Sequence, residues 1–293
     1  MLEEGLGNVS SDAGEKTDSA SLVLSEVRES VAWITLDRAA VRNAQNVELL
    51  SQLDQAWMRA ASDPAVLVIV LRGAGPTFSA GHDISADGAR MYYDAVGDTT
   101  AGAANRYFWE HGNYLGMSRR WRNVLKPSIA AVQGKCVAAG LALCWPCDLI
   151  VAADDAQFSD PTLLMGIPGI EYQGHVWELG VRRAKEMLFT ARSFTAHEAM
   201  AFGMVSKVVS AGDLDAEVAE LARRIAAMPP FAIALAKKAI NQVQDLQGFS
   251  AALDASFDTH QLGHVHNQLA HGTSLQGGTV ASMRERLKDA NPR

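Results

Sequence analysis

Residues Lys126 to Pro161 read KPSIAAVQGKCVAAGLALCWPCDLIVAADDAQFSDP, and this stretch decides the fold class. Ser128–Val132 and Leu149–Ala152 are short continuous apolar runs, which are typical of strands buried on both faces of a parallel sheet. Between them, Gly134 precedes an Ala- and Gly-rich segment that predicts a helix over about Val137–Trp145. A strand, a crossover helix and a second strand predict an α/β protein.

The same alternation extends toward the N-terminus. Leu67–Leu71 is another buried strand, and it stops at the loop signal Gly73-Ala74-Gly75-Pro76. An amphipathic helix is predicted over Asn46–Ser62, because apolar side chains recur there every three to four residues. Two short strands are predicted before it, over Leu22–Ser25 and Val31–Leu36.

Two other parts of the chain differ from this pattern. Residues 84 to about 115 are polar and irregular, which favours a mobile lid or loop. Beyond Pro229-Pro230 the sequence predicts helices without strands, over residues 231–244, 249–270 and 280–288.

Composition excludes several classes of protein. The chain has 293 residues, of which 48% are apolar and 20% charged, as in an ordinary globular protein. The net charge of −7 argues against a nucleic-acid partner, and no apolar run is long enough to predict a membrane span. Residues 1–20 are polar and lack the basic start and apolar stretch of a secretory signal, so we expect a disordered tail.

Cysteine usage indicates the compartment. Only Cys136, Cys144 and Cys147 are present, which favours a reducing environment, and we expect a cytoplasmic protein without disulfides. Cys144 and Cys147 form a C-x-x-C, but at the end of a predicted helix, whereas redox pairs of this kind open one. We therefore predict packed thiols.

Two segments share a design that suits an oxyanion. In each, a buried strand runs into Gly and then into small residues: LVIVLRGAGPTFSAGHDIS (67–85) and SIAAVQGKCVAAGLALC (128–144). Small residues let a ligand approach the backbone, and the first amides of a helix have no acceptor within it. Two such loops facing one another could hold a carbonyl oxygen from two sides; tight helix–strand packing is the alternative.

At these residues the chain resembles the enoyl-CoA hydratase/isomerase, or crotonase, superfamily. The resemblance covers about residues 22–238 and rests on ITLDRAAVRNAQN (34–46), GAGPTFSAGHDI (73–84), residues 126–161, GIP (166–168) and ARSFTAHEAMAFGMVSKVV (191–209). It implies a spiral of β-β-α turns over residues 21–228, followed by a C-terminal helical oligomerisation region over 229–293. It also implies an acyl-CoA thioester substrate, no cofactor beyond its coenzyme A, no metal, and a homotrimer or dimer of trimers.

The resemblance implies site residues position by position. The two oxyanion-hole N–H groups fall on Ala80 and on Ala139, where the family often has Gly. The coenzyme A contacts fall on four residues near the first loop: Arg42, Asn43, Ala44 and Ile84. Arg42 could meet a phosphate, and backbone around Ala44 and Ile84 could hold the adenine.

The pattern departs from the hydratases at their two catalytic glutamates. These positions carry Ala142 and Thr162, neither of which transfers protons usefully. The following loop, GIPGIEYQGHVWELG (166–180), supplies Glu171, Tyr172 and His175, which we predict as substitutes. His82, inside the first oxyanion loop, is a second candidate, because an imidazole near its ordinary pKa is a usable proton donor.

Other titratable residues are weaker candidates. Glu110 and His111 lie in the predicted lid. His260 and His264 have the i, i+4 spacing of metal ligands on a helix, but no neighbouring carboxylate joins them in sequence. We therefore expect these two, with His266 and His271, to form a polar face of a C-terminal helix.

Three functions remain open. The first is an acyl-CoA enzyme that stabilises an enolate and uses non-hydratase proton chemistry, as a lyase, isomerase or thioester hydrolase. The second is a hydratase with relocated acid–base groups. The third is a non-catalytic acyl-CoA-binding protein, which Ala142 and Thr162 would suit.

Overall fold

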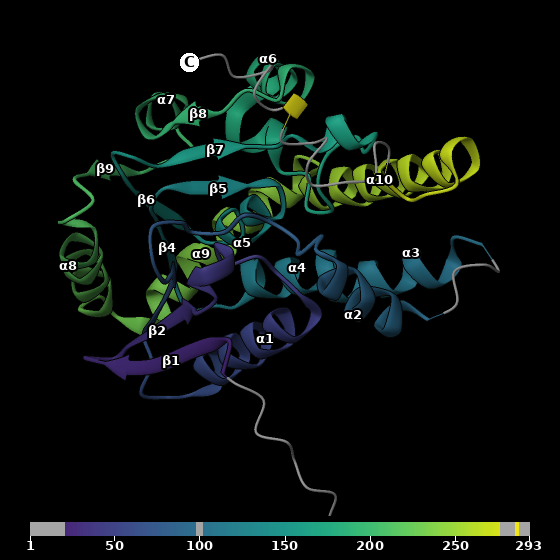
Figure 1. Cartoon of the computed structure of the whole chain (residues 1–293). Coiled ribbons are helices and arrows are strands. Elements are labelled where there is room, and N and C mark those ends of the chain that lie inside the picture. Colours follow the sequence, from purple (N-terminus) through teal and green to yellow (C-terminus); the bar gives the residue numbers. More distant parts are fainter. Residues whose placement is uncertain (1–20, 98–101, 276–284, 287–293) are drawn as a thin grey trace, which may run out of the picture.

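A six-stranded sheet forms the centre of the molecule (Figure 1). The computed structural model describes residues 21–97, 102–275 and 285–286. The strand order is β1-β2-β3-β4-β6-β9; β1 and β2 are antiparallel, and every other neighbouring pair is parallel. The strands are β1 (Val23–Arg28), β2 (Val31–Leu36), β3 (Val68–Gly73), β4 (Ser128–Val132), β6 (Leu149–Ala153) and β9 (Lys207–Val209).

A second, smaller sheet holds β5 (Lys135–Val137), β7 (Gln157–Ser159) and β8 (Phe194–Thr195). The chain alternates between the two sheets: β4 is followed by β5, and β6 by β7, with a helical segment after each pair. The turn before these repeats the pattern, since β3 leads to Ser79, which pairs with Cys136 of β5. These are the β-β-α turns of the predicted spiral, and the predicted α/β class is confirmed.

The large sheet is covered on both faces because its inner strands are apolar on both sides. Val68 and Val70 of β3 pack against helix α8 (Leu214–Ala226), while Ile69 and Leu71 face the main core. Helix α1 (Val47–Ser62) buries its apolar stripe in that core, and the side chain of Asn46 caps it by accepting from the amide of Leu49. The predicted helix over 46–62 is thus confirmed.

The expectation of a loop over residues 84–115 is wrong, because the described part of this segment is helical. It forms α2 (Ala86–Val96), α3 (Ala104–Glu110) and a π-helical turn, η2 (His111–Leu115), which runs into α4 (Gly116–Asn123). The side chain of Ser85 caps α2 by accepting from the amide of Gly88. Aromatic contacts between Tyr92, Trp109 and Tyr114 supply the packing that the polar composition concealed.

The predicted helix over 137–145 is only partly correct. Lys135–Val137 is the strand β5, and Ala138–Gly140 is a 3-10 turn, η3, so that only α5 (Leu141–Cys144) is α-helical. These residues form a strand because Cys136 pairs with Phe158 of β7, a long-range contact that local propensity does not report. All three cysteines are buried free thiols, as predicted.

The remaining helices are one short turn near the N-terminus and five helical segments in the C-terminal half. They are η1 (Ala39–Val41), η4 (Thr162–Met165), α6 (His175–Thr190), α7 (Ala196–Phe202), α9 (Pro230–Leu246) and α10 (Phe249–His271). Two of the three predicted C-terminal helices are thereby confirmed, while the third, over 280–288, lies outside the described residues except for 285–286, and the tail 1–20 lies wholly outside them. Within the described residues, no helix is long and apolar enough to cross a membrane.

Candidate active site

The loops that follow β3 and β5 lie against each other. The amide of Ser79 donates to Lys135 O at 3.2 Å, and the amide of Val137 donates to Ser79 O at 3.0 Å. Gly81 follows with φ +86°, and a Cβ there would come within 2.8 Å of Val137 O and 3.3 Å of Ala139 N. Only Gly fits this approach. The two segments expected to share an oxyanion are therefore adjacent.

The donor in the first loop has to be corrected. The amide of Ala80 already donates to the carbonyl oxygen of Arg42 at 3.0 Å, so it is not free for a ligand. The next two residues bond to Gln45: Gly81 O accepts its amide, and Asp83 N donates to its carbonyl, both at 2.8 Å. Successive amides of an extended chain point to opposite sides, so the N–H of His82 points away from Gln45. Among the described residues the His82 amide has no acceptor, so His82, and not Ala80, is the candidate donor of this loop.

The assignment of Ala139 as the second donor stays a prediction. Ala139 is buried in η3, where the first amides have no acceptor within the helix, and its nitrogen is the one that approaches Gly81.

A small cavity opens beside these loops. Its lining includes His82, Tyr114, Met117, Ala142, Glu171 and Tyr172. Four predicted positions therefore meet there: the candidate His82, the substitutes Glu171 and Tyr172, and Ala142 in place of the first glutamate.

Glu171 is the carboxylate of this cavity. Its side chain is buried, and His82 Nε2 lies 3.2 and 3.3 Å from its two oxygens. Burial raises its pKa, but the charges of His82 and His260 and the hydrogen bond from His82 outweigh burial and hold the pKa below its usual range. The His82 ring stacks on Tyr114 with 4.2 Å between centroids, which fixes its orientation. The pair presents an ionised carboxylate, which the lowered pKa makes a weaker base than an ordinary glutamate.

Tyr172 lies in the cavity wall as a neutral phenol. Its side chain is 1% exposed, and burial raises its pKa well above the usual range. The ring packs edge-on to Phe249 of α10, with 6.0 Å between centroids. Tyr172 therefore shapes the cavity and does not offer an anion.

His175 is not part of the cavity, and this prediction is corrected. It is 1% exposed at the start of α6, with Nε2 3.0 Å from Asp160 Oδ2 and its ring edge-on to Trp145. Asp160 also accepts from the amides of Thr162 and Ile170, at 3.0 and 3.2 Å. The Asp160 carboxylate thus anchors the loop that carries Glu171 through these two amides. His175 lies behind the loop because it contacts Asp160 and Trp145, and these long-range contacts could not be predicted from the sequence.

The predicted coenzyme A contacts separate into two kinds. Arg42 is exposed in a left-handed turn, φ 59°, and Ala44 and Ile84 are partly exposed. Asn43 is different: it is fully buried, and its Nδ2 donates to Ala74 O, Thr77 O and Phe78 O. Its side chain is committed to the protein and is not available to a ligand.

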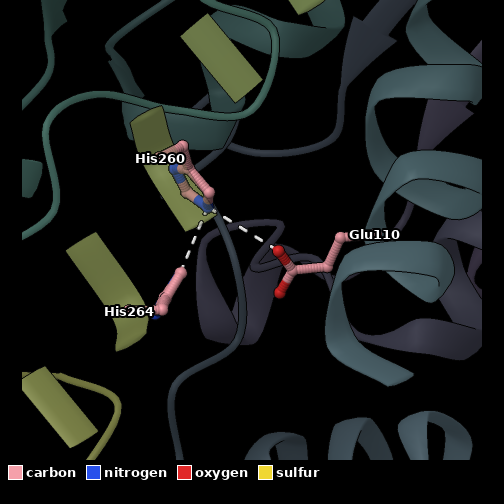
Figure 2. A group of neighbouring side chains, drawn as sticks. All are labelled: Glu110, His260 and His264. Carbon is pink, nitrogen blue, oxygen red and sulfur yellow. Dashed lines mark hydrogen bonds and ion pairs between the residues drawn. The ribbon is translucent and has the colours of Figure 1, made fainter. Parts of the chain in front are cut away.

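A second polar cluster lies behind Glu171, and here the expectation of a polar helix face is wrong for two of the four histidines. His260 and His264 are buried on α10; His260 points toward Glu110, the last residue of α3, and His264 points toward His260 (Figure 2). His260 Nε2 lies 3.1 Å from His264 Nε2, 3.7 Å from Glu110 Oε2 and 3.5 Å from Glu171 Oε1. His266 and His271 are exposed, as expected.

The electrostatics of this cluster differ between its members. Burial lowers the pKa of His260, but Glu171 and Glu110 outweigh it and raise the pKa to about 9. Burial and the charge of His260 lower the pKa of His264 to about 4. Burial raises the pKa of Glu110, but His260 and His264 hold it below its usual range. The two imidazoles together thus carry one positive charge, which lies between the two carboxylates.

The cluster contains the one set of residues, in the described part of the chain, whose ligand atoms could converge on a metal. One ligand atom from each of Glu110, His260 and His264 lies within 4.8 Å of the others. The i, i+4 spacing of the histidines was the available signal. Glu110 was a weak candidate, and nothing in the sequence linked it to residues 150 positions away. His111, its neighbour, is exposed on η2 and does not join the cluster.

With this geometry established, comparisons with known proteins identify the family. The sequence profile described as "Enoyl-CoA hydratase/isomerase" matches residues 26–276. The chain belongs to the enoyl-CoA hydratase/isomerase family. A Mycobacterium smegmatis structure described as a probable enoyl-CoA hydratase is similar at 52% identity and TM-score 0.80, over 86% of this chain and 98% of that one.

Members of the family with different names resemble the chain. It is 46% identical over 261 residues to "Putative enoyl-CoA hydratase EchA13" of Mycobacterium tuberculosis, covering 85% of this chain and 82% of that protein. It is 31% identical over 248 residues to "4-chlorobenzoyl coenzyme A dehalogenase-2" of an Arthrobacter species, covering 84% and 85%. Family membership makes the chain an acyl-CoA enzyme of crotonase type, and the relatives' names differ on the reaction.

Proposed function

We propose that this family member is an acyl-CoA isomerase that moves a double bond by proton transfer through a thioester enolate. The thioester carbonyl would lie between the N–H groups of His82 and Ala139, and Glu171 would act as the base. Coenzyme A would cross the loop at Arg42, whose exposed guanidinium suits a phosphate, with the adenine near Ala44 and Ile84.

The observation that carries this proposal is the Glu171 carboxylate in the cavity wall, paired with His82 at 3.2 Å. Hydration requires one group to activate water while another protonates carbon. A double-bond shift requires a single base, which removes a proton from one carbon and returns it to another. The cavity has Ala142 where the first hydratase glutamate would be, so a single carboxylate favours the shift.

Each proposed step balances. Glu171 takes the α-proton of a 3-enoyl-CoA, and the electrons of the C–H bond delocalise into the carbonyl. The resulting enolate oxygen would accept hydrogen bonds from the two amides, which oxyanion holes place where charge develops. Glu171 then returns the proton to carbon 4, which leaves the conjugated 2-enoyl-CoA and the original carboxylate.

A hydratase with Glu171 and His82 as its acid–base pair is the second candidate. It is favoured by the names of the relatives above and by the contact between the two side chains, which could share a water-derived proton.

The test uses 3-hexenoyl-CoA for isomerisation, crotonyl-CoA for hydration, and butyryl-CoA in deuterated water for exchange of α-protons. We expect isomerisation and exchange by the wild-type protein, and Glu171→Gln to lower both at least tenfold, since loss of an acid–base group typically costs about 10²–10⁴ in rate. The matched control is Glu220→Gln, on the exposed face of α8, which should leave both rates unchanged.

The alternatives give different results. Rapid hydration of crotonyl-CoA without isomerisation would establish the second candidate. Binding of all three thioesters without exchange or turnover would indicate a non-catalytic acyl-CoA-binding protein.

A further inference from the structure

Three potential ligand atoms converge behind the cavity, from two helices far apart in the sequence. Glu110 ends α3, and His260 and His264 lie one turn apart on α10 (Figure 2). The Nε2 atoms of the histidines are 3.1 Å apart, and His260 Nε2 is 3.7 Å from Glu110 Oε2. In a tetrahedral site with metal–nitrogen bonds of about 2.0–2.1 Å, neighbouring ligand atoms are about 3.3 Å apart. Two of the three separations are therefore within about 0.4 Å of the spacing of a metal site, and the third is at most 4.8 Å.

The backbone fixes the tautomers of both histidines. His260 Nδ1 lies 2.7 Å from Gly169 O, and His264 Nδ1 lies 3.0 Å from Ser274 O. A carbonyl oxygen only accepts, so both Nδ1 atoms must carry the proton. In the neutral rings, both Nε2 lone pairs then point into the same space. Metal-binding histidines are held in this way, by a carbonyl or carboxylate on the other ring nitrogen.

When His260 is charged, the proton on its Nε2 lies between the two nitrogens. When both rings are neutral, the two lone pairs at this separation repel unless another cation lies between them. A proton would bridge only one pair of atoms, whereas a metal ion would contact the carboxylate as well. Glu110 is already held in place for this: Tyr92 Oη donates to its Oε1 at 2.5 Å, and Gln261 donates to its Oε2, which keeps a second lone pair.

Gln261 supplies an independent observation. Its Oε1 is buried and has no hydrogen-bond partner among the described residues, although its Nε2 bonds to Glu110. Buried acceptors are rarely left without a donor. A water on a metal held by Glu110 would provide that donor beside the cluster.

We propose that Glu110, His260 and His264 bind a divalent first-row transition-metal ion, with Zn²⁺ as the best fit. Two imidazoles and one carboxylate suit Zn²⁺ and its neighbours, whereas Ca²⁺ and Mg²⁺ prefer oxygen ligands in larger numbers. Three protein ligands leave a position open, as in other zinc sites that hold water. The ion would join α3 to α10 and lie close to Glu171, whose Oε1 is 3.5 Å from His260 Nε2.

The test measures metal binding by the full-length protein, freed of any affinity tag and treated with a chelator. Zn²⁺ is titrated calorimetrically and Co²⁺ by its visible absorption, which reports nitrogen and oxygen ligands directly. We expect one equivalent of each, and at least 100-fold weaker binding in His264→Gln. His266→Gln with His271→Gln is the matched control, because these histidines are exposed on the same helix; binding should be unchanged.

Glu110→Gln tests the same site from α3, which covers the case in which His264→Gln fails to fold. Zinc that binds the wild type no better than either folded variant would overturn the proposal. So would binding that disappears in the double control variant, which would place zinc on the surface. If nitrogen NMR finds His260 Nε2 still protonated with zinc in excess, a proton and not zinc lies between the two histidines, and the proposal is also overturned. None of these readouts depends on the proposed isomerase activity.

Discussion

Asn43 allows a sharp test of how the first loop is held. Its Oδ1 accepts from the amide of Arg38 at 2.9 Å, and its Nδ2 faces three carbonyl oxygens, of Ala74, Thr77 and Phe78, at 2.8 to 3.1 Å. In Asn43→Asp an oxygen replaces Nδ2. The variant retains the bond from Arg38 but turns three attractive contacts into repulsive ones.

The expected magnitude follows from those contacts. Asn43→Ala leaves the buried carbonyls without a donor, at about 1–3 kcal/mol for each group that water cannot reach, so we expect a loss of about 3 kcal/mol in the free energy of unfolding. Asn43→Asp should cost about 3–5 kcal/mol at neutral pH, the usual result of leaving a buried charge unpaired.

The two variants differ most clearly in their pH dependence. The carboxyl introduced by Asn43→Asp would be buried among carbonyl oxygens, so its folded pKa should lie above its unfolded value of about 3.9. The folded state then binds a proton that the unfolded state has lost. Stability should therefore fall as pH rises from about 4 to the folded pKa, by up to about 1.4 kcal/mol per pH unit. Asn43→Ala adds no titrating group and should show no such slope.

Urea unfolding followed by tryptophan fluorescence, at pH 5, 6, 7 and 8, measures this directly. Gln55→Glu is the matched control, because it makes the same change from amide to carboxylate on the exposed part of α1. An Asn43→Asp variant with pH-independent stability, or either variant within about 1 kcal/mol of the wild type, would refute the argument that this amide holds the loop.

Three further predictions follow from the site and the core. Gly81→Ala should lower acyl-CoA affinity and turnover at least tenfold, because its Cβ would meet Val137 O at 2.8 Å and φ is +86°; unchanged kinetics would remove this loop from the site. Burial raises the pKa of Asp160, but hydrogen bonds from His175 and Thr162 outweigh burial and hold the pKa below its usual range. Asp160 therefore stabilises the fold at any pH above its unfolded pKa, and this contribution is lost as pH falls toward the folded pKa. Asp160→Asn should therefore have a lower free energy of unfolding than the wild type at pH 7, by about 2 kcal/mol, which is typical of a hydrogen bond to a charged group. This difference should narrow below about pH 4; a difference in urea unfolding that does not change with pH would contradict this. Phe257→Ala, at a fully buried side chain in the main core, should lower the free energy of unfolding by about 3–5 kcal/mol in the same assay. A decrease below about 1 kcal/mol would show instead that neighbouring side chains fill the space left by the ring.

The central strands were predictable because their residues are apolar on both faces. Ile69 and Leu71 face one core and Val68 and Val70 the other, so the run that marks β3 is continuous. The short strands of the second sheet were not predictable in the same way. Cys136 and Phe158 form a pair that depends on contacts between distant segments, and such contacts override local propensity.

The candidate site was partly predictable for a related reason. Glu171 and His82 lie in loops that the family motifs bracket, and the cavity brings them together. Ala80 was misassigned because motif position does not show which way an amide points; that depends on the bridge to Gln45. His260 was misassigned because apolar and polar residues alternate around most of the circumference of α10, so the pattern did not reveal which histidine is buried.

The π-helical turn η2 has a consequence for mutation by deletion. It directly follows Glu110, which faces α10, and it contains Tyr114, which stacks on His82 in the cavity. Removing one residue from this turn would restore α-helical spacing and rotate everything on one side of it by about 100° relative to the other. Glu110 and Tyr114 could not then both keep their partners. This turn therefore sets the orientation of the cavity wall relative to the histidine cluster. A single-residue deletion here should be tolerated far less well than its place on a partly exposed surface turn suggests.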